Sequence, residues 1–111
     1  MKFSRSLLIA TMLAFGSASA FASGSGTGKI NSIVVIGNGA VMIGLPTHTG
    51  APACASAPEF VIDTASANGK AIYALALTAI SQGNSVSING NGVCDVWADR
   101  ETALQLWVTP Q

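Results

Sequence analysis

Few side chains in this 111-residue sequence could carry out catalysis. His48 is the single histidine and therefore the one candidate general base for hydrolysis. Hydrolysis needs a nucleophile, a base and an orienting group that converge. His48 lies among proline, glycine and threonine, where a histidine is commonly solvated, and the spacing of Asp63, Asp95 and Asp99 places no two of them on one face of an element. We therefore expect no enzyme, with a small hydrolase or inhibitor as a remaining alternative.

Two tryptophans could instead bind a ligand. Trp97 lies close in sequence to Asp95 and Asp99, and Trp107 lies in the last apolar segment. A sugar ring has an apolar face and a rim of hydroxyl groups, so sugar sites combine an aromatic side chain with carboxylates and amides. These four residues are the predicted ligand-binding residues. The alternative is that the tryptophans fill a small core.

The two cysteines, Cys54 and Cys94, predict one disulfide bond. They are 40 residues apart and not in a C-x-x-C motif, and a single histidine is a poor basis for a metal site. We expect neither a metal nor another cofactor. In the chain-entropy model, closing such a loop contributes about 2–4 kcal/mol to stability.

Residues 1–22 have the layout of a signal peptide. Lys2 and Arg5 precede an apolar run over residues 7–15, and small residues lead to cleavage sites after Ala20 or Ala22. The run is about half of the roughly 20 apolar residues that a membrane-spanning helix needs. The mature chain is therefore predicted to be secreted or periplasmic, which suits a disulfide.

The predicted mature chain carries little charge. Three basic side chains stand against five acidic ones, a formal charge of −2. Without a basic patch, neither nucleic acid nor an anionic lipid surface is an expected partner. Because so few side chains are charged, part of the surface must be apolar, which is typical of oligomer contacts.

The hydrophobic pattern predicts one domain over residues 30–111, preceded by a flexible lead-in at residues 23–29. Strands are expected over residues 30–36, 40–45, 59–63, 85–89 and 103–108, and one helix over residues 67–82. Thr64, Ser66 and Asn68 are candidate N-caps of the helix, and Gly83 is its expected C-cap. In the last strand, Leu104, Leu106 and Val108 are expected to share one face.

The predicted order is strand, strand, strand, helix, strand, strand. It matches a mainly β fold with one helix, a small five-stranded OB-like Greek-key barrel. An open α+β sandwich fits the same order. The Gly37-Asn38-Gly39 segment is not a dinucleotide-binding fingerprint, because a strand rather than a helix is expected to follow it.

The expected helix has two apolar faces. Its inward stripe is predicted to consist of Ile72, Leu75, Ala76, Ala79 and Ile80. Tyr73, Ala74 and Leu77 lie opposite, and they are the predicted contact with a symmetry mate. The alternative is an ordinary exposed face that contacts nothing.

The segment Gly69 to Ile88, followed by Gly92-Val93-Cys94, is similar to a pattern in small exported proteobacterial proteins, in which a helix ends at a glycine before a strand with alternating valines. It resembles the binding subunit of subtilase cytotoxin and, more loosely, other pentameric toxin B subunits. The resemblance implies an OB fold, a homopentamer whose helices line its centre, outer faces that bind host glycans and a catalytic A-type subunit as partner.

Two functions from different classes follow. The first is a secreted or periplasmic, non-enzymatic binding subunit that recognises glycans and forms homo-oligomers. The alternative is a monomeric exported protein without a small-molecule ligand.

Overall fold

The structure, a computed structural model, describes residues 23–110. The predicted signal peptide, residues 1–22, lies outside the described residues. In chain order the elements are β1 (Ser25–Gly28), β2 (Ser32–Val35), a short 3-10 turn η1 (Gly37–Gly39), β3 (Ala40–Gly44), β4 (Phe60–Asp63), α1 (Ala67–Gln82), β5 (Ser85–Gly90) and β6 (Glu101–Thr109).

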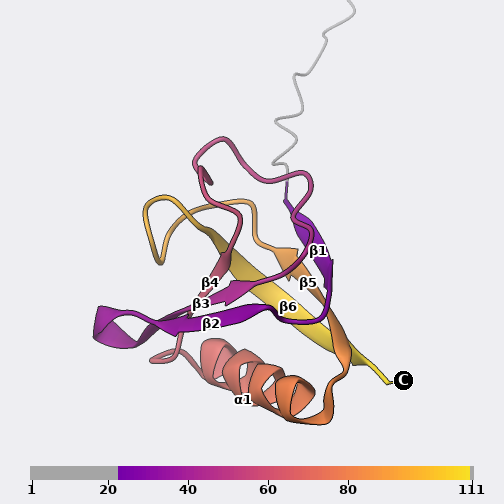
Figure 1. The fold of residues 1–111 in the computed structure, drawn as a ribbon. Coiled ribbons are helices and arrows are strands. Elements are labelled where there is room, and N and C mark those ends of the chain that lie inside the picture. The colour runs from indigo at the N-terminus through magenta and orange to yellow at the C-terminus, as the bar shows by residue number, and fades with distance from the viewer. Residues whose placement is uncertain (1–22, 111) are drawn as a thin grey trace, which may run out of the picture.

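The strands form one six-stranded sheet in the order β1-β5-β6-β4-β3-β2. Only the β4–β6 pair among the described strands is parallel. The two strands at opposite ends of this order, β1 and β2, are joined by only residues 29–31, so the sheet has to curve strongly. Within residues 23–110 the sheet curves without closing into a barrel, and α1 lies across one end of it (Figure 1). The prediction of a mainly β fold with one helix is confirmed.

The predicted order of elements matches the structure if β1 and β2 are counted as one interrupted strand. The expectation of a flexible lead-in at residues 23–29 is wrong, because β1 pairs with β5 along residues 25–28. The sequence of β1, Ser-Gly-Thr-Gly, has little intrinsic strand preference. Pairing with β5 holds the strand instead. Close packing explains its glycine, because a Cβ on Gly26 would collide with the Thr47 carbonyl oxygen and lie 3.0 Å from the Phe60 ring.

The core lies between the curved sheet and the inner face of α1. It contains the following buried side chains: Val41, Ile43, Leu45, Phe60, Ile62, Ile72, Ala76, Ala79, Val86, Ile88 and Ala103. The expected alternation in β5 is confirmed, because Val86 and Ile88 are both buried. A second, smaller cluster of Ala40, Met42 and Val61 lies outside this core, and Ile36 and Val96 pack against it. Strands β3 and β4 therefore each contribute some residues to the core and others to the second cluster.

The helix has the predicted bounds and caps. The Ser66 side chain accepts a hydrogen bond from the Gly69 N–H, and Gly83 adopts the left-handed conformation at φ 67°. Among the described residues, no helix has the length and apolar character needed to cross a membrane.

The helix buries a narrower stripe than predicted, and three of the four buried residues are glycine or alanine. Gly69, Ile72, Ala76 and Ala79 are buried, whereas the prediction that Leu75 and Ile80 are buried is wrong. Small residues let the helix approach the sheet closely, and a Cβ on Gly69 would collide with the backbone of Asp63. The large side chains at the flanks are left partly in solvent.

The predicted contact face of the helix is only partly exposed. Tyr73 is half-buried and packs against the core, so it does not lie opposite the buried stripe as expected. Ala74 and Leu77 are exposed.

A bulge in β6 changes the predicted face of one leucine. Asn89 pairs with Gln105 and Gly90 with Ala103, so Leu104 is the extra residue. Leu106 and Val108 pack against the core as expected, but Leu104 is exposed, and its expected position on their face is wrong.

The first residue of β6, Glu101, carries a fully buried carboxylate. The Gly24 N–H donates to both of its oxygens, at 3.1 Å to Oε1 and 2.8 Å to Oε2. The Gly92 N–H donates to Oε2 at 2.9 Å, and His48 Nε2 lies 2.8 Å from Oε1. A buried carboxylate is tolerated only when such partners replace water. Glu101 thus joins three segments that are far apart in sequence.

The expectation that His48 is solvated is wrong, because its side chain is 3 % exposed. Its ring stacks on Phe60 at 3.9 Å between centroids, and Nδ1 lies 2.7 Å from the Pro58 carbonyl oxygen. Because a carbonyl only accepts, Nδ1 must carry hydrogen.

Replacing Glu101 with alanine tests this cluster. Glu101→Ala leaves two buried N–H groups without their acceptor and His48 without its partner, and the free energy of unfolding should fall by about 3–5 kcal/mol. The matched control is Glu59→Ala, which removes a 30 % exposed side chain and leaves Arg100 its contact with Asp99, so its loss of stability should be clearly smaller. Guanidinium denaturation measures both values, and equal losses would contradict the central role of Glu101.

Candidate binding site

The connection between β5 and β6, residues 91–100, is held at several points. The predicted disulfide Cys54–Cys94 is present, with 6.2 Å between the Cα atoms, and ties this connection to the one between β3 and β4. The Val93 N–H donates to the Asn91 side chain at 3.0 Å, and the Thr102 hydroxyl donates to Asp95. We call residues 91–100 the β5–β6 loop.

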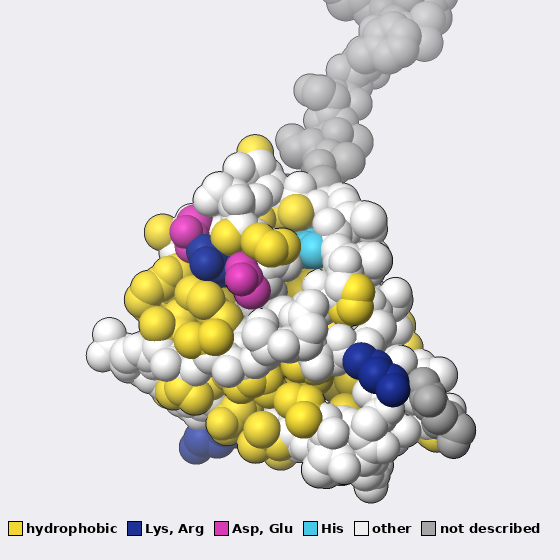
Figure 2. Space-filling model, viewed as in Figure 1, with side chains coloured by type: hydrophobic (Ala, Val, Ile, Leu, Met, Phe, Trp, Pro, Cys, Tyr) yellow, Lys and Arg dark blue, Asp and Glu magenta, His cyan; other side chains and the backbone are white. Residues whose placement is uncertain are grey.

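Charged side chains add a further anchor to the β5–β6 loop. Arg100 Nε lies 3.0 Å from Glu59 Oε2, and its guanidinium group also contacts the Asp99 carboxylate. These are charge contacts rather than aligned hydrogen bonds. Figure 2 shows the acidic and basic groups side by side, with hydrophobic side chains next to them. Asp99 is therefore engaged by Arg100.

A depression of about 260 Å³ lies between the turn that joins β2 to β3 and the β5–β6 loop. Its lining contains an aromatic ring, two carboxylates and one amide, from Trp97, Asp63, Asp95 and Asn38. Trp97 is 36 % exposed, so its ring is available to a ligand. Beneath this site, Ala40 and Val96 belong to or pack against the second core cluster, which gives it a packed base. We call this depression the loop site.

The loop site continues into a second depression of about 220 Å³, which reaches the start of α1. Asp63, Asp95 and Val96 line both. The two carboxylates thus border both depressions. Oδ1 of Asp63 accepts from the Ala65 N–H and Oδ1 of Asp95 from the Thr102 hydroxyl, so Oδ2 of each can accept a hydrogen bond from a hydroxyl group of a ligand.

Hydrogen bonding keeps one of these carboxylates ionised. The Thr102 hydroxyl lowers the pKa of Asp95 below its ordinary value of 3.8, and the Asn91 side chain and nearby backbone groups act in the same direction. Partial burial opposes them. Asp95 is therefore an anionic acceptor near neutral pH.

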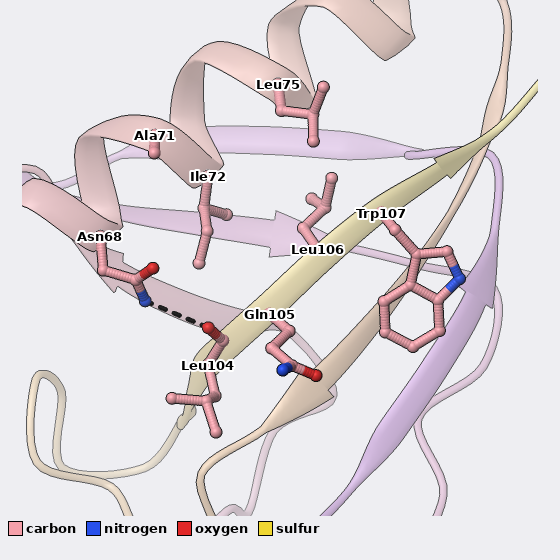
Figure 3. A pocket seen from close by; sticks show the side chains of 8 residues that line it. All are labelled: Asn68, Ala71, Ile72, Leu75, Leu104, Gln105, Leu106 and Trp107. Atoms are coloured by element: carbon pink, nitrogen blue, oxygen red, sulfur yellow. Dashed lines mark hydrogen bonds between the residues drawn. The ribbon is translucent and has the colours of Figure 1, made fainter.

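A larger groove of about 440 Å³ lies elsewhere, between α1 and β6. Figure 3 shows Leu75 and Leu106 facing each other between the helix and the strand, and Trp107 on the other side of β6. The groove is lined by Asn68, Ala71, Ile72, Leu75, Leu104, Gln105, Leu106 and Trp107. We call it the α1–β6 groove.

The structure divides the four predicted ligand-binding residues. Trp97 and Asp95 meet at the loop site, and Asp99 pairs with Arg100. Trp107 borders the α1–β6 groove, which shares no lining residue with the loop site. Sequence reasoning missed Asn38 and Asp63 as lining residues. Asn38 is the middle residue of a Gly-Asn-Gly turn, at φ 66°, and Asp63 ends β4, so both occupy places where polar side chains commonly line a site.

His48, the one candidate base, has both ring nitrogens engaged by Pro58 and Glu101. Among the described residues, no three histidine, cysteine, aspartate or glutamate side chains gather as metal ligands would.

Comparison with known proteins shows no match to a protein-family model, to a curated protein or to a solved structure. The resemblance to toxin binding subunits therefore stays a prediction, and the geometry of the chain itself supplies the evidence for function.

Removing the disulfide should weaken the anchoring of the β5–β6 loop. The double variant Cys54→Ser/Cys94→Ser avoids a lone reactive thiol and should lower the free energy of unfolding by about 2–4 kcal/mol. Denaturation of the oxidised and the variant protein measures the difference. Two free thiols in the unreduced wild-type protein would contradict the bond.

The variant Thr102→Val should raise the pKa of Asp95 toward 3.8, because it removes the main cause of the lowered value. NMR titration of the carboxyl carbon measures this shift. Since the pKa is lowered in the folded state, Asp95 adds stability above about pH 4, and that contribution is lost as the pH falls through the folded-state pKa. The variant should lose part of this pH dependence, and an unchanged titration would contradict the assignment.

Proposed function

We propose that the mature chain is an exported, non-enzymatic protein that binds a neutral glycan at the loop site. The single observation that carries this proposal is the combination of the Trp97 ring with Asp63, Asp95 and Asn38 around one depression. The ring can stack on the apolar face of a sugar, and the carboxylates and the amide can bond its hydroxyl groups. A secreted or periplasmic location is part of the proposal and rests on the predicted signal peptide.

The position of the loop site in the fold supports this function. With β1 and β2 counted as one strand, the site lies between the connection of strands 1 and 2 and the connection of strands 4 and 5. In OB folds these two loops bind oligonucleotides and oligosaccharides. Two carboxylates and no basic side chain are found in the described lining, so the phosphates of an oligonucleotide would be repelled. The same charge favours neutral over acidic sugars.

Anchoring of the β5–β6 loop also supports binding. The disulfide, the Arg100 contacts and the hydrogen bond from Thr102 hold the loop before any ligand arrives. A ligand then loses less free energy to the ordering of the site.

Self-association is the second part of the proposal, as in the pentameric subunits that the sequence resembles. Its support is the amount of exposed apolar surface. The exposed large side chains include Val34, Val35, Leu75, Leu77, Ile80, Leu104 and Trp107.

A glycan array with the purified mature protein, followed by calorimetry with the best-bound sugar as a soluble oligosaccharide, tests glycan binding. Trp97→Ala should weaken binding about tenfold or more, because an aromatic contact worth about 1.4 kcal/mol corresponds to a tenfold change in affinity. Trp107→Ala is the matched control, since Trp107 is similarly exposed at 46 % but lies outside the loop site. Because a monovalent sugar occupies one site at a time, its measured affinity does not depend on how many copies of the protein associate.

Three results would contradict this function. The array could show no bound glycan, in which case an exported protein without a small-molecule ligand takes its place. It could show binding to sialylated glycans alone, which would contradict the preference for neutral sugars. Equal weakening by both tryptophan variants would move binding away from the loop site.

A further inference from the structure

The sequence contains four Asn-Gly pairs, and the structure holds them in different ways. They are Asn38-Gly39, Asn68-Gly69, Asn89-Gly90 and Asn91-Gly92. In such a pair the backbone nitrogen of the glycine can attack the side-chain carbonyl carbon of the asparagine, because glycine has no Cβ to obstruct the approach. The attack requires that the glycine N–H is accessible and that the asparagine backbone can rotate.

Two of the pairs are closed to this attack because their glycine N–H groups are bonded inside the domain. The Gly90 N–H donates to the Gly24 carbonyl at 2.8 Å, and the Gly92 N–H donates to Glu101 Oε2 at 2.9 Å. Gly90 and Gly92 are also buried. Attack by either nitrogen therefore requires local opening of the fold, which lowers the fraction of molecules that can react.

The pair in the helix is held at both of its residues. The Gly69 N–H donates to the Ser66 hydroxyl oxygen at 2.9 Å, and the Asn68 side chain donates to the Leu104 carbonyl at 3.1 Å. Both residues lie in the first turn of α1, where the helical backbone fixes their dihedral angles. This pair therefore also has to open before it can react.

The fourth pair lies at the tip of the turn between β2 and β3, which projects from the domain (Figure 1). Asn38 is exposed, and a Cβ added to Gly37 would meet no atom within 4 Å, so the space around the tip is open. Within residues 23–110 the Gly39 N–H makes no hydrogen bond beyond its own turn. Closing a ring requires rotation of the Asn38 backbone away from φ 66°, and a glycine on each side permits this rotation.

We propose that Asn38 is a modification site at which the folded protein deamidates itself. Hydroxide removes the proton of the Gly39 nitrogen, and this nitrogen forms a bond to Cγ of Asn38. The bond between Cγ and Nδ2 breaks, and the side-chain nitrogen takes a proton from water and leaves as ammonia. The succinimide ring then adds water at one of its carbonyl carbons and opens to aspartate or isoaspartate. The sum consumes one water and releases one ammonia, without oxidation or reduction.

The modification changes the chemistry of the loop site. Asn38 lines this site together with Asp63 and Asp95, so either product adds a third carboxylate. The conversion removes an amide that can donate a hydrogen bond, and isoaspartate also lengthens the backbone of the turn. This consequence rests on the proposed function: the unmodified site binds a neutral glycan, and the modified site should bind it more weakly. Deamidation of Asn38 therefore limits how long the protein keeps its affinity.

Peptide mapping by mass spectrometry tests the modification in the purified mature protein. After incubation at mildly alkaline pH, Asn38 should show the mass change of an NH2 group replaced by OH, with isoaspartate among the products. The other three asparagines should react about tenfold or more slowly, because each pair must first break a hydrogen bond. The reduced and denatured protein is the control, in which all four pairs should react at similar rates.

The variant Asn38→Gly removes the reactive amide and keeps the turn, because glycine adopts a positive φ without strain. Isoelectric focusing should show a more acidic form in the incubated wild-type protein and far less of it in the variant. An unmodified Asn38 in the folded protein would overturn the proposal. So would equal rates at the four pairs in the folded state, because the structure would then not select Asn38.

Calorimetry with the soluble oligosaccharide tests the effect on binding. Asn38→Asp, which reproduces one product, should weaken binding about fivefold or more, because a hydrogen-bond donor is lost and a charge is added. Asn31→Asp is the matched control, since Asn31 is exposed and lies outside the loop site, and it should bind with the wild-type affinity. Equal affinity of wild type and Asn38→Asp would overturn the effect on binding.

The two measurements keep this inference separate from the proposed function. Peptide mapping requires no ligand, so a glycan array without a bound sugar leaves the modification of Asn38 standing. An unmodified Asn38 overturns the modification and leaves glycan binding at the loop site standing.

Discussion

The burial of one carboxylate constrains most of this small domain. Glu101 is removed from water, and each of its oxygens has to find protein donors. The backbone donors come from the segment before β1 and from the start of the β5–β6 loop, and His48 Nε2 is the remaining partner. The surrounding backbone has to come close, and it does so at glycines: a Cβ on Gly24 or Gly90 would collide with the Glu101 side chain. Gly24 and Gly90, which are far apart in sequence, are therefore part of the same arrangement.

The same cluster connects the fold to the candidate site. Gly92 bonds Glu101 at the beginning of the β5–β6 loop, and Thr102, the residue after Glu101, bonds Asp95 within that loop. The disulfide and the Arg100 contacts hold the loop further along. Trp97 is thus presented by a loop that is attached at its start, in its middle and at its end. An aromatic ring on an anchored loop, beside two carboxylates, suits recognition of a rigid ligand such as a sugar ring.

Local patterns predicted part of this arrangement. The helix over residues 67–82 and its C-cap Gly83 follow from neighbouring residues alone, whereas the structure selects Ser66 among the three candidate N-caps. Strand β5 and the turn at Gly37-Asn38-Gly39 also follow from neighbouring residues, because the alternation of apolar and polar residues and the preference for a turn extend over only a few positions. The cysteine pair followed from its even number in a chain with a predicted signal peptide. In the candidate site, Trp97 and Asp95 were predicted together because they are neighbours in one loop. Asn38 and Asp63 join them from other elements, so their part in the site could not be predicted from spacing.

The sequence by itself determined the class of fold, the helix, most strands and the disulfide, because each depends on short-range pattern or on residue count. Only the tertiary structure decided that Ser25–Gly28 is a strand, that His48 is buried against Glu101, and that Trp97 and Trp107 lie on different surfaces. It also decided that Leu104 faces outward, through a bulge, and that Leu75 and Ile80 flank the buried stripe. Each of these features depends on packing and hydrogen bonding between segments that are far apart in sequence. A local sequence pattern therefore cannot predict them.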